Sequence, residues 1–337
     1  MKKIKIVILL SVIIIIGCKQ SSEEYFNRGK EKYNLKKYPE AIVDFTKAID
    51  IDSKFADAYY NRGKAKSKLL DYEGAIADYS EVLEIKPNDT ASYNQRGYAR
   101  YKLKDYKGAI TDYNKVININ PKNAKAYFNR GTAEHKLQDY TNAIADFTKA
   151  LEIDSKLAEA YNNRGLAKSG NKDYKGAIED YTKTLEINPK FAEAYNNRGT
   201  EKQDINDYDG AIVDYTRAIE IDSKYSQAYY NRGIAEFTIE EFNKAIADYT
   251  KALEIDSDFS AAYQNRGKAK AKLKDYSGAI ADFTKLIEIN PDNAEAYFSR
   301  GVMKIVKYKN ESGCSDLKKA GALGYTKAYD MIKEYCQ

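Results

Sequence analysis

Asn61-Arg62-Gly63 is the stretch of sequence that decides the fold, because it returns, unchanged or nearly so, every 34 residues. Its glycine marks nine copies, at Gly29, Gly63, Gly97, Gly131, Gly165, Gly199, Gly233, Gly267 and Gly301. A constant period of about 20 to 50 residues is the signature of a protein built from stacked repeats. Nine repeats account for nearly all of the 337 residues, so we expect one elongated array rather than two globular domains.

Each repeat is expected to be a helical hairpin. With Ala56 as position 1, apolar spacing predicts a first helix, helix A, from Ala56 to about Leu69, and a second, helix B, from about Tyr72 to Ile85. Asp71 stands where it can cap helix B. The same capping residue is expected at Asp105, Asp139, Asp173, Asp207 and Asp275.

A large aromatic residue, a glycine, a small residue and a second aromatic residue recur at fixed places, as Tyr59, Gly63, Ala75 and Tyr79 in the second repeat. This pattern resembles the tetratricopeptide repeat family. The resemblance implies an all-α fold, a right-handed superhelix of helix-turn-helix repeats. Over residues 22–325 it implies nine units, at 22–55, 56–89, 90–123, 124–157, 158–191, 192–225, 226–259, 260–293 and a degenerate 294–325. A capping helix is expected at 326–337. Gly170, late in a helix A, is expected to be a flexible joint.

The chain begins with a basic start and an apolar run from Ile6 to Ile16, which is too short to span a bilayer. The run ends in Gly17-Cys18 and resembles a bacterial lipobox, in which the cysteine thiol becomes the lipid attachment point. We therefore expect residues 1–17 to be a lipoprotein signal peptide that is removed, and 18–21 to be a lipidated cysteine with a short tether. The mature protein would then be exported and anchored to a bacterial membrane, facing the periplasm or at the outer membrane. An ordinary secretion signal or a membrane anchor is the alternative.

Two further cysteines, Cys314 and Cys336, fall in the last repeat. In an exported protein such a pair can form a disulfide, and in a reduced cytosolic one it would not. The alternative is that Cys314, where other repeats carry Ile, is a small core residue.

Arg precedes the glycine in every repeat, where the tetratricopeptide pattern usually has Leu, and helix B carries an Asp in every repeat. An Arg at a helix interface needs a carboxylate, so we expect a series of Arg–Asp ion pairs that join helices. Two alternatives are that each Asp pairs with the Lys three residues on, or that the arginines face a ligand.

The sequence contains no recognisable catalytic constellation. His135 is its one histidine, and its neighbours indicate only a surface residue of helix A. A Gly-rich phosphate loop, a Cys-x-x-Cys pair and a His-Glu-x-x-His motif are absent from the sequence. The 55 basic and 50 acidic residues are interspersed, unlike a nucleic-acid footprint. We expect no enzyme activity, no cofactor, no metal, no nucleic acid partner, and membrane contact through the lipid only.

The family resemblance places positions 2, 5, 6, 9, 12 and 13 of helix A on the concave wall. Position 6 carries a carboxamide in eight repeats, here called the amide row: Asn27, Asn61, Gln95, Asn129, Asn163, Asn197, Asn231 and Asn265. A carboxamide both donates to and accepts from a peptide main chain. The row resembles the peptide-binding asparagines of the superhelix in protein O-linked glycosyltransferases. The alternative is that these residues only stabilise the helix A stack.

Aromatic and basic residues flank the amide row in the first half of the array, and they are expected to line the same groove: Tyr60, Lys64, Lys68, Tyr98, Tyr101, Lys102, Phe128 and Lys136. Because the wall becomes more neutral beyond Gly170, an acidic stretch of a ligand is expected in the first half. The sequence thus predicts a non-catalytic scaffold or adaptor that binds a protein or an extended peptide. The alternative is a structural or accessory subunit of an envelope assembly for secretion, export or glycosylation, or a repeat protein that assembles with itself.

Overall fold

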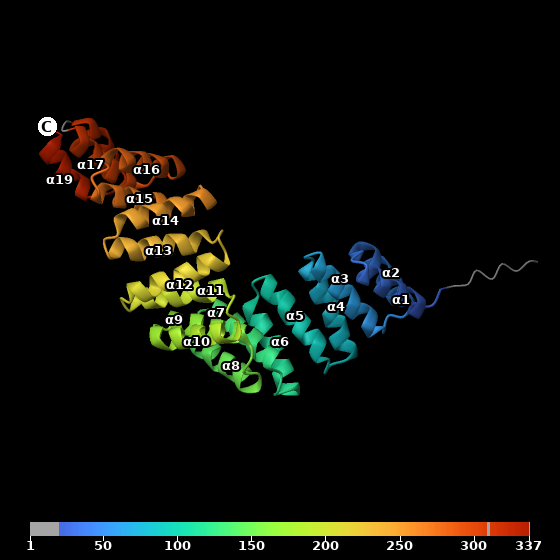
Figure 1. Ribbon diagram of the computed structural model, residues 1–337. Coiled ribbons are helices and arrows are strands. Elements are labelled where there is room, and N and C mark those ends of the chain that lie inside the picture. Colours follow the sequence, from blue (N-terminus) through green and yellow to red (C-terminus); the bar gives the residue numbers. More distant parts are fainter. Residues whose placement is uncertain (1–19, 309–310, 337) are drawn as a thin grey trace, which may run out of the picture. The chain divides into compact units, whose positions relative to one another are not determined.

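The computed structural model describes residues 20–308 and 311–336. In this part of the chain, α-helices follow one another as hairpins and there is no strand (Figure 1). The predicted all-α repeat fold is confirmed. The predicted signal peptide and Cys18, the predicted site of lipid attachment, lie outside the described residues.

Helix A and helix B alternate along the chain. The helices at the helix A positions are α1 (Ser22–Asn34), α3 (Ala56–Lys68), α5 (Thr90–Lys102), α7 (Ala124–Lys136), α9 (Ala158–Gly170), α11 (Ala192–Asp204), α13 (Ser226–Thr238), α15 (Ser260–Lys272) and α17 (Ala294–Tyr308). Those at the helix B positions are α2 (Tyr38–Ile51), α4 (Tyr72–Ile85), α6 (Tyr106–Ile119), α8 (Tyr140–Ile153), α10 (Tyr174–Ile187), α12 (Tyr208–Ile221), α14 (Phe242–Ile255), α16 (Tyr276–Ile289) and α18 (Cys314–Ala322). A short 3₁₀ turn (Glu311–Gly313) precedes α18, and α19 (Lys327–Tyr335) ends the described chain.

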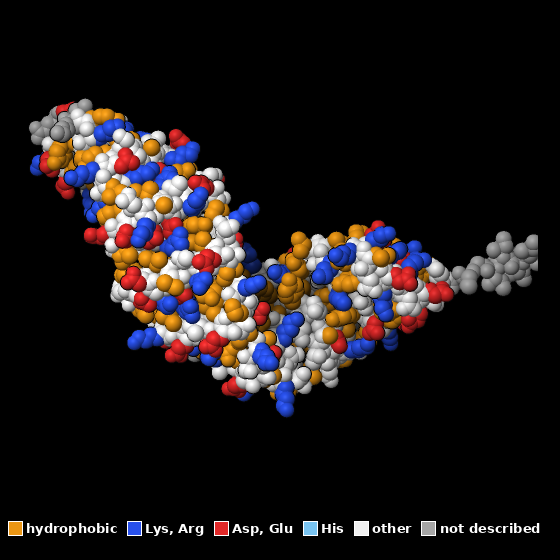
Figure 2. Space-filling model, in the orientation of Figure 1, with side chains coloured by type: hydrophobic (Ala, Val, Ile, Leu, Met, Phe, Trp, Pro, Cys, Tyr) orange, Lys and Arg blue, Asp and Glu red, His pale blue; other side chains and the backbone are white. Residues whose placement is uncertain are grey.

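The chain divides into two compact units, an N-terminal block up to Ala133 and a C-terminal block from Glu134 onward. The N-terminal block holds α1 to α6 and most of α7. The C-terminal block holds the end of α7 and all later helices. On the face seen in Figure 2, basic and acidic side chains are interspersed over both blocks. None of the described helices combines the length and the apolar character needed to cross a bilayer.

The turn within each hairpin is set by local chemistry. The Asp71 side chain accepts a hydrogen bond from the Gly74 backbone N–H at 2.9 Å, and so caps α4 as predicted. The other five predicted Asp caps also accept a bond from their helix B. The residue just before helix B's N-cap has a positive φ in the first eight hairpin turns, as at Leu70 with φ 64°. This left-handed residue reverses the chain between the helices.

The contact between helix A and helix B depends on the repeated glycine. A Cβ added to Gly63 would lie 2.9 Å from Cε1 of Tyr79, so the ring lies directly against the helix A backbone. Gly29 meets Phe45 in the same way. Tyr79 and Phe45 have no exposed surface. The glycine therefore makes room for a buried aromatic ring, as the tetratricopeptide resemblance implied.

Gly170 has a packing reason of the same kind, which the sequence did not reveal. A Cβ at this glycine would lie 2.6 Å from Cζ of Tyr140, at the start of α8 in the preceding repeat. The expected flexible joint at Gly170 is therefore better described as a contact point between repeats. The division into blocks falls elsewhere, after Ala133.

Candidate functional site

Helix A forms a layer of its own within each block. Consecutive helix A members contact each other, as α1–α3 and α3–α5 in the N-terminal block and α9–α11, α11–α13 and α13–α15 in the C-terminal block. Because helices two apart in sequence touch on this side, the layer is the inner wall of the helical stack. The amide row and its predicted neighbours all belong to this layer.

Ion pairs between helix A and helix B hold the wall in place. Arg62 of α3 bonds Asp78 of α4 through Nε and Nη2, at 3.0 and 2.7 Å. Its Nη1 donates to Thr46 Oγ1 of the preceding helix B at 3.1 Å. A second cation, Lys66, lies 2.9 Å from Asp78. Asp78 is only 2% exposed, so its two partners compensate the burial of its charge.

The same Arg–Asp bond occurs in seven further repeats: Arg28–Asp44, Arg96–Asp112, Arg164–Asp180, Arg198–Asp214, Arg232–Asp248, Arg266–Asp282 and Arg300–Asp316. The predicted series of ion pairs is therefore confirmed. The Lys three residues after the Asp has another partner, since Lys183 pairs with Glu186 at 2.7 Å. These Arg–Asp bonds show that the arginines hold helix A and helix B together.

The electrostatics of these pairs follow from their contacts. The hydrogen bond from Arg28 holds the pKa of Asp44 below its usual value, although burial opposes this. For Asp316, burial raises the pKa, but the bonds from Arg300 and Lys304 outweigh it and the net direction is down. These carboxylates therefore stay ionised at neutral pH.

The second cation is replaced by an acid in two repeats, as Glu134 in the fourth and Glu236 in the seventh. Glu236 stands where every repeat except the fourth and seventh carries Lys or Arg, and it faces Asp248 instead of neutralising it. Its Oε2 is buried and has no hydrogen-bond partner in the described residues. Burial, and then the charge of Asp248, raises the pKa of Glu236 to about 7.

Every member of the amide row is exposed or half-buried on helix A. In three consecutive repeats of the C-terminal block, the row's side-chain N–H donates to the residue at position 5 of the preceding repeat. These bonds are Asn197 to Asn162 Oδ1 at 3.4 Å, Asn231 to Asn196 Oδ1 at 3.0 Å, and Asn265 to the Tyr230 hydroxyl at 3.1 Å. A carboxamide has two N–H donors and a carbonyl with two lone pairs. The three residues thus join the helix A stack and retain hydrogen-bonding capacity for a ligand.

The predicted aromatic and basic residues lie in the N-terminal block, apart from Lys136, and several of them contact an aromatic ring. Lys64 Nζ lies 5.0 Å from the Tyr33 ring centre and 5.8 Å from that of Tyr60. Lys102 lies 5.3 Å above the Tyr98 ring. Tyr101 packs edge-on against Tyr106, Phe128 is half-buried, and Lys68 and Lys136 are exposed. His135 is half-buried against the Tyr140 ring, not on the surface as expected, and this burial lowers its pKa.

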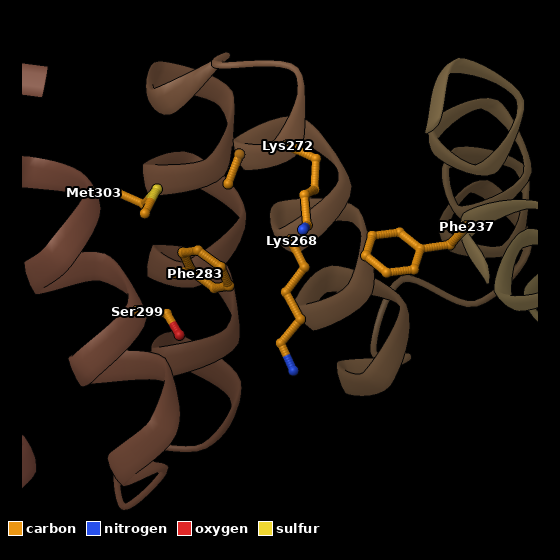
Figure 3. A pocket seen from close by; sticks show the side chains of 7 residues that line it. Phe237, Lys268, Lys272, Phe283, Ser299 and Met303 are labelled. Atoms are coloured by element: carbon orange, nitrogen blue, oxygen red, sulfur yellow. The ribbon is translucent and has the colours of Figure 1, made fainter. Parts of the chain in front are cut away.

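Two hollows open on the helix A side of the C-terminal block. One, of about 450 Å³, includes the amide-row residue Asn197 and is lined by Ala192, Glu193, Asn197, Asp222 and Tyr225. The other, of about 330 Å³, is lined by Phe237, Lys268, Ala271, Lys272, Phe283, Ser299 and Met303 (Figure 3). We call it the Lys268 pocket.

The Lys268 pocket was missed by sequence reasoning, which placed basic groups only in the first half of the array. The sequence does indicate this pocket, at positions that depart from the repeat pattern. Ser299 ends the amide row, and Met303 replaces the Ala of most repeats. No group of His, Cys, Asp and Glu suited to a metal ion occurs among the described residues.

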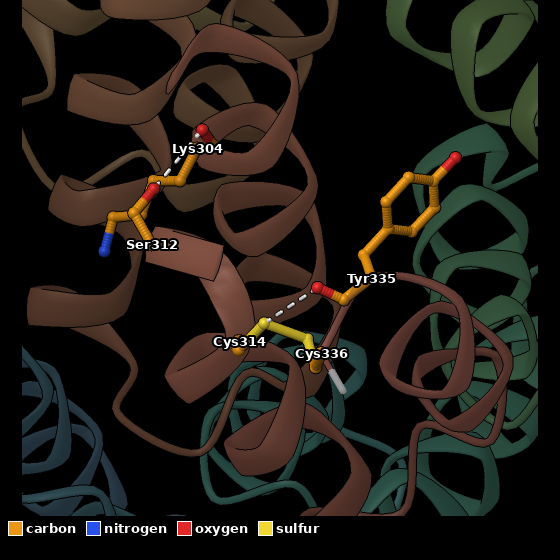
Figure 4. The surroundings of a disulfide bond; sticks show 5 residues. All are labelled: Lys304, Ser312, Cys314, Tyr335 and Cys336. Atoms are coloured by element: carbon orange, nitrogen blue, oxygen red, sulfur yellow. Dashed lines mark hydrogen bonds between the residues drawn. A yellow bond between two sulfur atoms is a disulfide. The ribbon is translucent and has the colours of Figure 1, made fainter. Parts of the chain in front are cut away.

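The last helices close the array. Cys314 at the start of α18 forms a disulfide with Cys336 just after α19, so the pairing that the sequence left open is made (Figure 4). The bond ties the final helix onto the last hairpin. The Tyr325 ring packs on Phe298 of α17, with ring centres 4.8 Å apart. α18, α19 and the disulfide thus cover the end of the stack.

Stacked hairpins joined by recurring glycine–aromatic contacts and buried ion pairs define a helical-repeat solenoid, the class of protein that works by presenting a surface. The chain belongs to the tetratricopeptide repeat family. The Tetratricopeptide repeat model of that family matches residues 56–89, 124–157, 158–191, 192–225 and 226–259. A second model, TPR repeat, matches residues 29–69, 97–138 and 270–304.

Solved structures share the fold. A tetratricopeptide repeat protein from Parabacteroides merdae is 18% identical with a TM-score of 0.58, over 74% of this chain and 99% of that one. A chain of the APC/C hetero-tetramer Cut9-Hcn1 is 15% identical with a TM-score of 0.53, over 93% of this chain and 76% of that one. YrrB, a TPR protein with an unusual peptide-binding site, is 24% identical with a TM-score of 0.49, over 56% of this chain and 97% of that one. No curated protein matches the chain.

Proposed function

We propose that this protein is a non-catalytic scaffold that holds an extended peptide segment of a partner protein on its helix A wall. The observation that carries the proposal is the amide row of the C-terminal block. Its carboxamides lie on helices that contact one another, and they retain hydrogen-bonding capacity. The hollow at Asn197 opens beside this row.

Rigidity of the wall supports binding by many weak contacts. The Arg–Asp bond fixes helix A, as between Arg198 and Asp214, and the amide at position 6 directly precedes that Arg. A preformed row loses little conformational entropy on binding. Each peptide hydrogen bond contributes only about 0.5 to 1.5 kcal/mol, so several repeats are needed for useful affinity.

The test separates ligand contact from helix stacking. Peptides selected from a random 12-residue phage library on the full chain are measured against an Asn197→Ala/Asn231→Ala variant. The matched control is Asn162→Ala/Asn196→Ala, which removes the same inter-repeat hydrogen bonds from the acceptor side, at residues only 3% and 6% exposed. We expect the first variant to lose binding and the second to keep it. Equal losses in both would show that the row only stabilises the stack.

We also propose that the protein is exported and held at a bacterial membrane through a lipid on Cys18. The lipobox-like sequence before this residue supports the proposal. The disulfide between Cys314 and Cys336 also supports it, because such bonds persist in oxidising compartments. Cells fed labelled palmitate should label the wild-type protein and not a Cys18→Ser variant. An unlabelled wild-type protein in the soluble fraction would refute the proposal.

A further inference from the structure

The Lys268 pocket lies on the same wall as the amide row, at the end where the row stops. Phe237 projects from α13 toward Lys268 and Lys272 on α15, and Ser299 and Met303 project from α17 on the side of Phe283 (Figure 3). The lining therefore comes from three consecutive repeats of the C-terminal block. Its walls are aromatic and aliphatic, and its polar groups are two ammonium groups and one hydroxyl.

The hollow exists because two small residues meet there. Ala271 occupies the position that carries Phe237 in the preceding repeat. Ser299 occupies the amide-row position, where a carboxamide would reach further. Removing volume from neighbouring helices at the same level leaves about 330 Å³, the size of a small ligand site.

The charge at the pocket is incompletely compensated. Lys268 Nζ lies 2.9 Å from Glu295 Oε1, with both side chains about two-fifths exposed. Lys272 is exposed and forms no ion pair with a described residue. Two cations with one acid leave a positive rim beside an apolar interior, which suits a ligand that is apolar at one point and anionic next to it.

We propose that the Lys268 pocket takes one large apolar side chain, such as Leu or Phe, of an extended peptide that carries an acidic side chain next to it. The inference rests on the proposed function, since the amide row would hold the same peptide's main chain. The apolar side chain fills the space between Phe237, Phe283 and Met303. The carboxylate meets the Lys272 ammonium group at the rim.

The probe is a fluorescent ten-residue peptide with one Leu followed by Asp-Glu in a Gly-Ser-Asn background, its C-terminus amidated. It is titrated against the full chain by fluorescence polarisation. Replacing Leu by Ala in the peptide should weaken binding about tenfold or more, because the apolar contact is lost. Replacing Asp-Glu by Lys-Lys should abolish binding, and added salt should weaken the original peptide.

Two protein variants test the pocket itself. Ala271→Phe fills the hollow with the residue that the preceding repeat carries at this position, so the helix tolerates it. Lys272→Glu reverses the charge at the rim, and we expect about fivefold weaker binding or more. Lys224→Glu makes the same charge change at an exposed turn outside the pocket, and binding should persist. Circular dichroism verifies that each variant is folded.

The outcomes decide between this inference and the proposed function. Unchanged binding in Ala271→Phe and Lys272→Glu, with loss in the amide-row variant, would overturn the pocket and leave the scaffold proposal intact. Binding that requires a free C-terminal carboxylate would also overturn it, because the anion would then be the chain end. Peptide binding that no pocket or amide-row variant reduces would overturn both.

Discussion

At neutral pH, replacement of Glu236 by Gln should stabilise the protein, although most substitutions of buried residues destabilise. Glu236 is 6% exposed on α13 and stands where seven of the nine repeats place a cation against the helix B carboxylate. Asp248, its neighbour, already has Arg232 at 2.6 Å. The ionised Glu236 therefore adds a second negative charge to a site that holds one Arg, with Lys244 contributing a weaker attraction.

The magnitude follows from the pKa. Burial and Asp248 raise the pKa of Glu236 from 4.5 to about 7. Since each pKa unit corresponds to about 1.4 kcal/mol, the ionised form costs at most about 3 kcal/mol in the folded state. Water at the wall screens part of this, so we expect Gln to add about 1 to 2 kcal/mol at pH 8.

The sign of the pH dependence is fixed by proton binding. Between pH 4.5 and about 7 the folded protein holds the Glu236 proton and the unfolded chain releases it. The folded state binds more protons, so this residue's contribution to stability falls as the pH rises through that window. Gln has no proton to lose. The advantage of the variant should thus vanish below about pH 4.5 and be complete above about pH 7.

The assay is thermal unfolding of the wild-type protein and Glu236→Gln at pH 5 and pH 8, with hydrogen exchange of α13 and α14 as the local readout. A gain of 1 to 2 kcal/mol corresponds to about 2 to 8 °C in Tm. Lys270→Gln is the matched control, because Lys270 occupies the same position and lies 2.8 Å from Asp282. This control should lose stability at both pH values. An advantage of Glu236→Gln that is equal at pH 5 and pH 8 would refute the reasoning.

Three further substitutions, one of them with a matched control, test the packing by thermal unfolding. Asp180→Asn removes the negative charge that Arg164 and Lys168 share, and it should lower the free energy of unfolding by about 2 to 3 kcal/mol. An unchanged Tm would argue against the ion pairs as a stabilising feature. Tyr181→Phe should stabilise the protein by about 1 kcal/mol, because the buried hydroxyl of Tyr181 has no hydrogen-bond partner in the described residues. Tyr215→Phe is its control and should not stabilise the protein, because the Tyr215 hydroxyl has hydrogen-bond partners at 3.4 Å. Gly170→Ala should destabilise the protein by about 1 to 3 kcal/mol, although Ala has the better helix propensity, because the new Cβ would meet the Tyr140 ring. A higher Tm in this variant would contradict that contact.

The fold was readable from the sequence because its determining contacts are local and repeated. The ring of Tyr79 packs on Gly63 sixteen residues earlier, and the Arg62–Asp78 bond has the same spacing. A contact that recurs at constant spacing appears in the sequence as a periodic pattern of residues. The helix bounds were therefore predicted within one residue in the second repeat, where α3 ends at Lys68.

Contacts that occur at one place in the array leave no such periodic pattern. The Tyr140 ring contacts Gly170 at one place in the array. When the repeats are compared position by position in the sequence, Gly170 is therefore interpreted as a weak point of its helix. The Lys268 pocket likewise arises from the coincidence of Ala271 and Ser299 in adjacent repeats. Each residue alone is an ordinary variation. Only the packed helices show that the two small side chains leave space at the same level.

Each helix A carries two functions on two faces. Its Arg and glycine face helix B and hold the hairpin together, while the carboxamide one residue before the Arg lies on the open wall. Because the ion pair fixes the helix independently of the wall residues, substitutions at Asn197 or Lys272 can change what is bound while the core remains intact. Wall and core variants should therefore separate in experiment: Asp180→Asn lowers stability, whereas Lys272→Glu alters binding with an unchanged Tm. A large loss of stability in Lys272→Glu would show that the two faces are not independent.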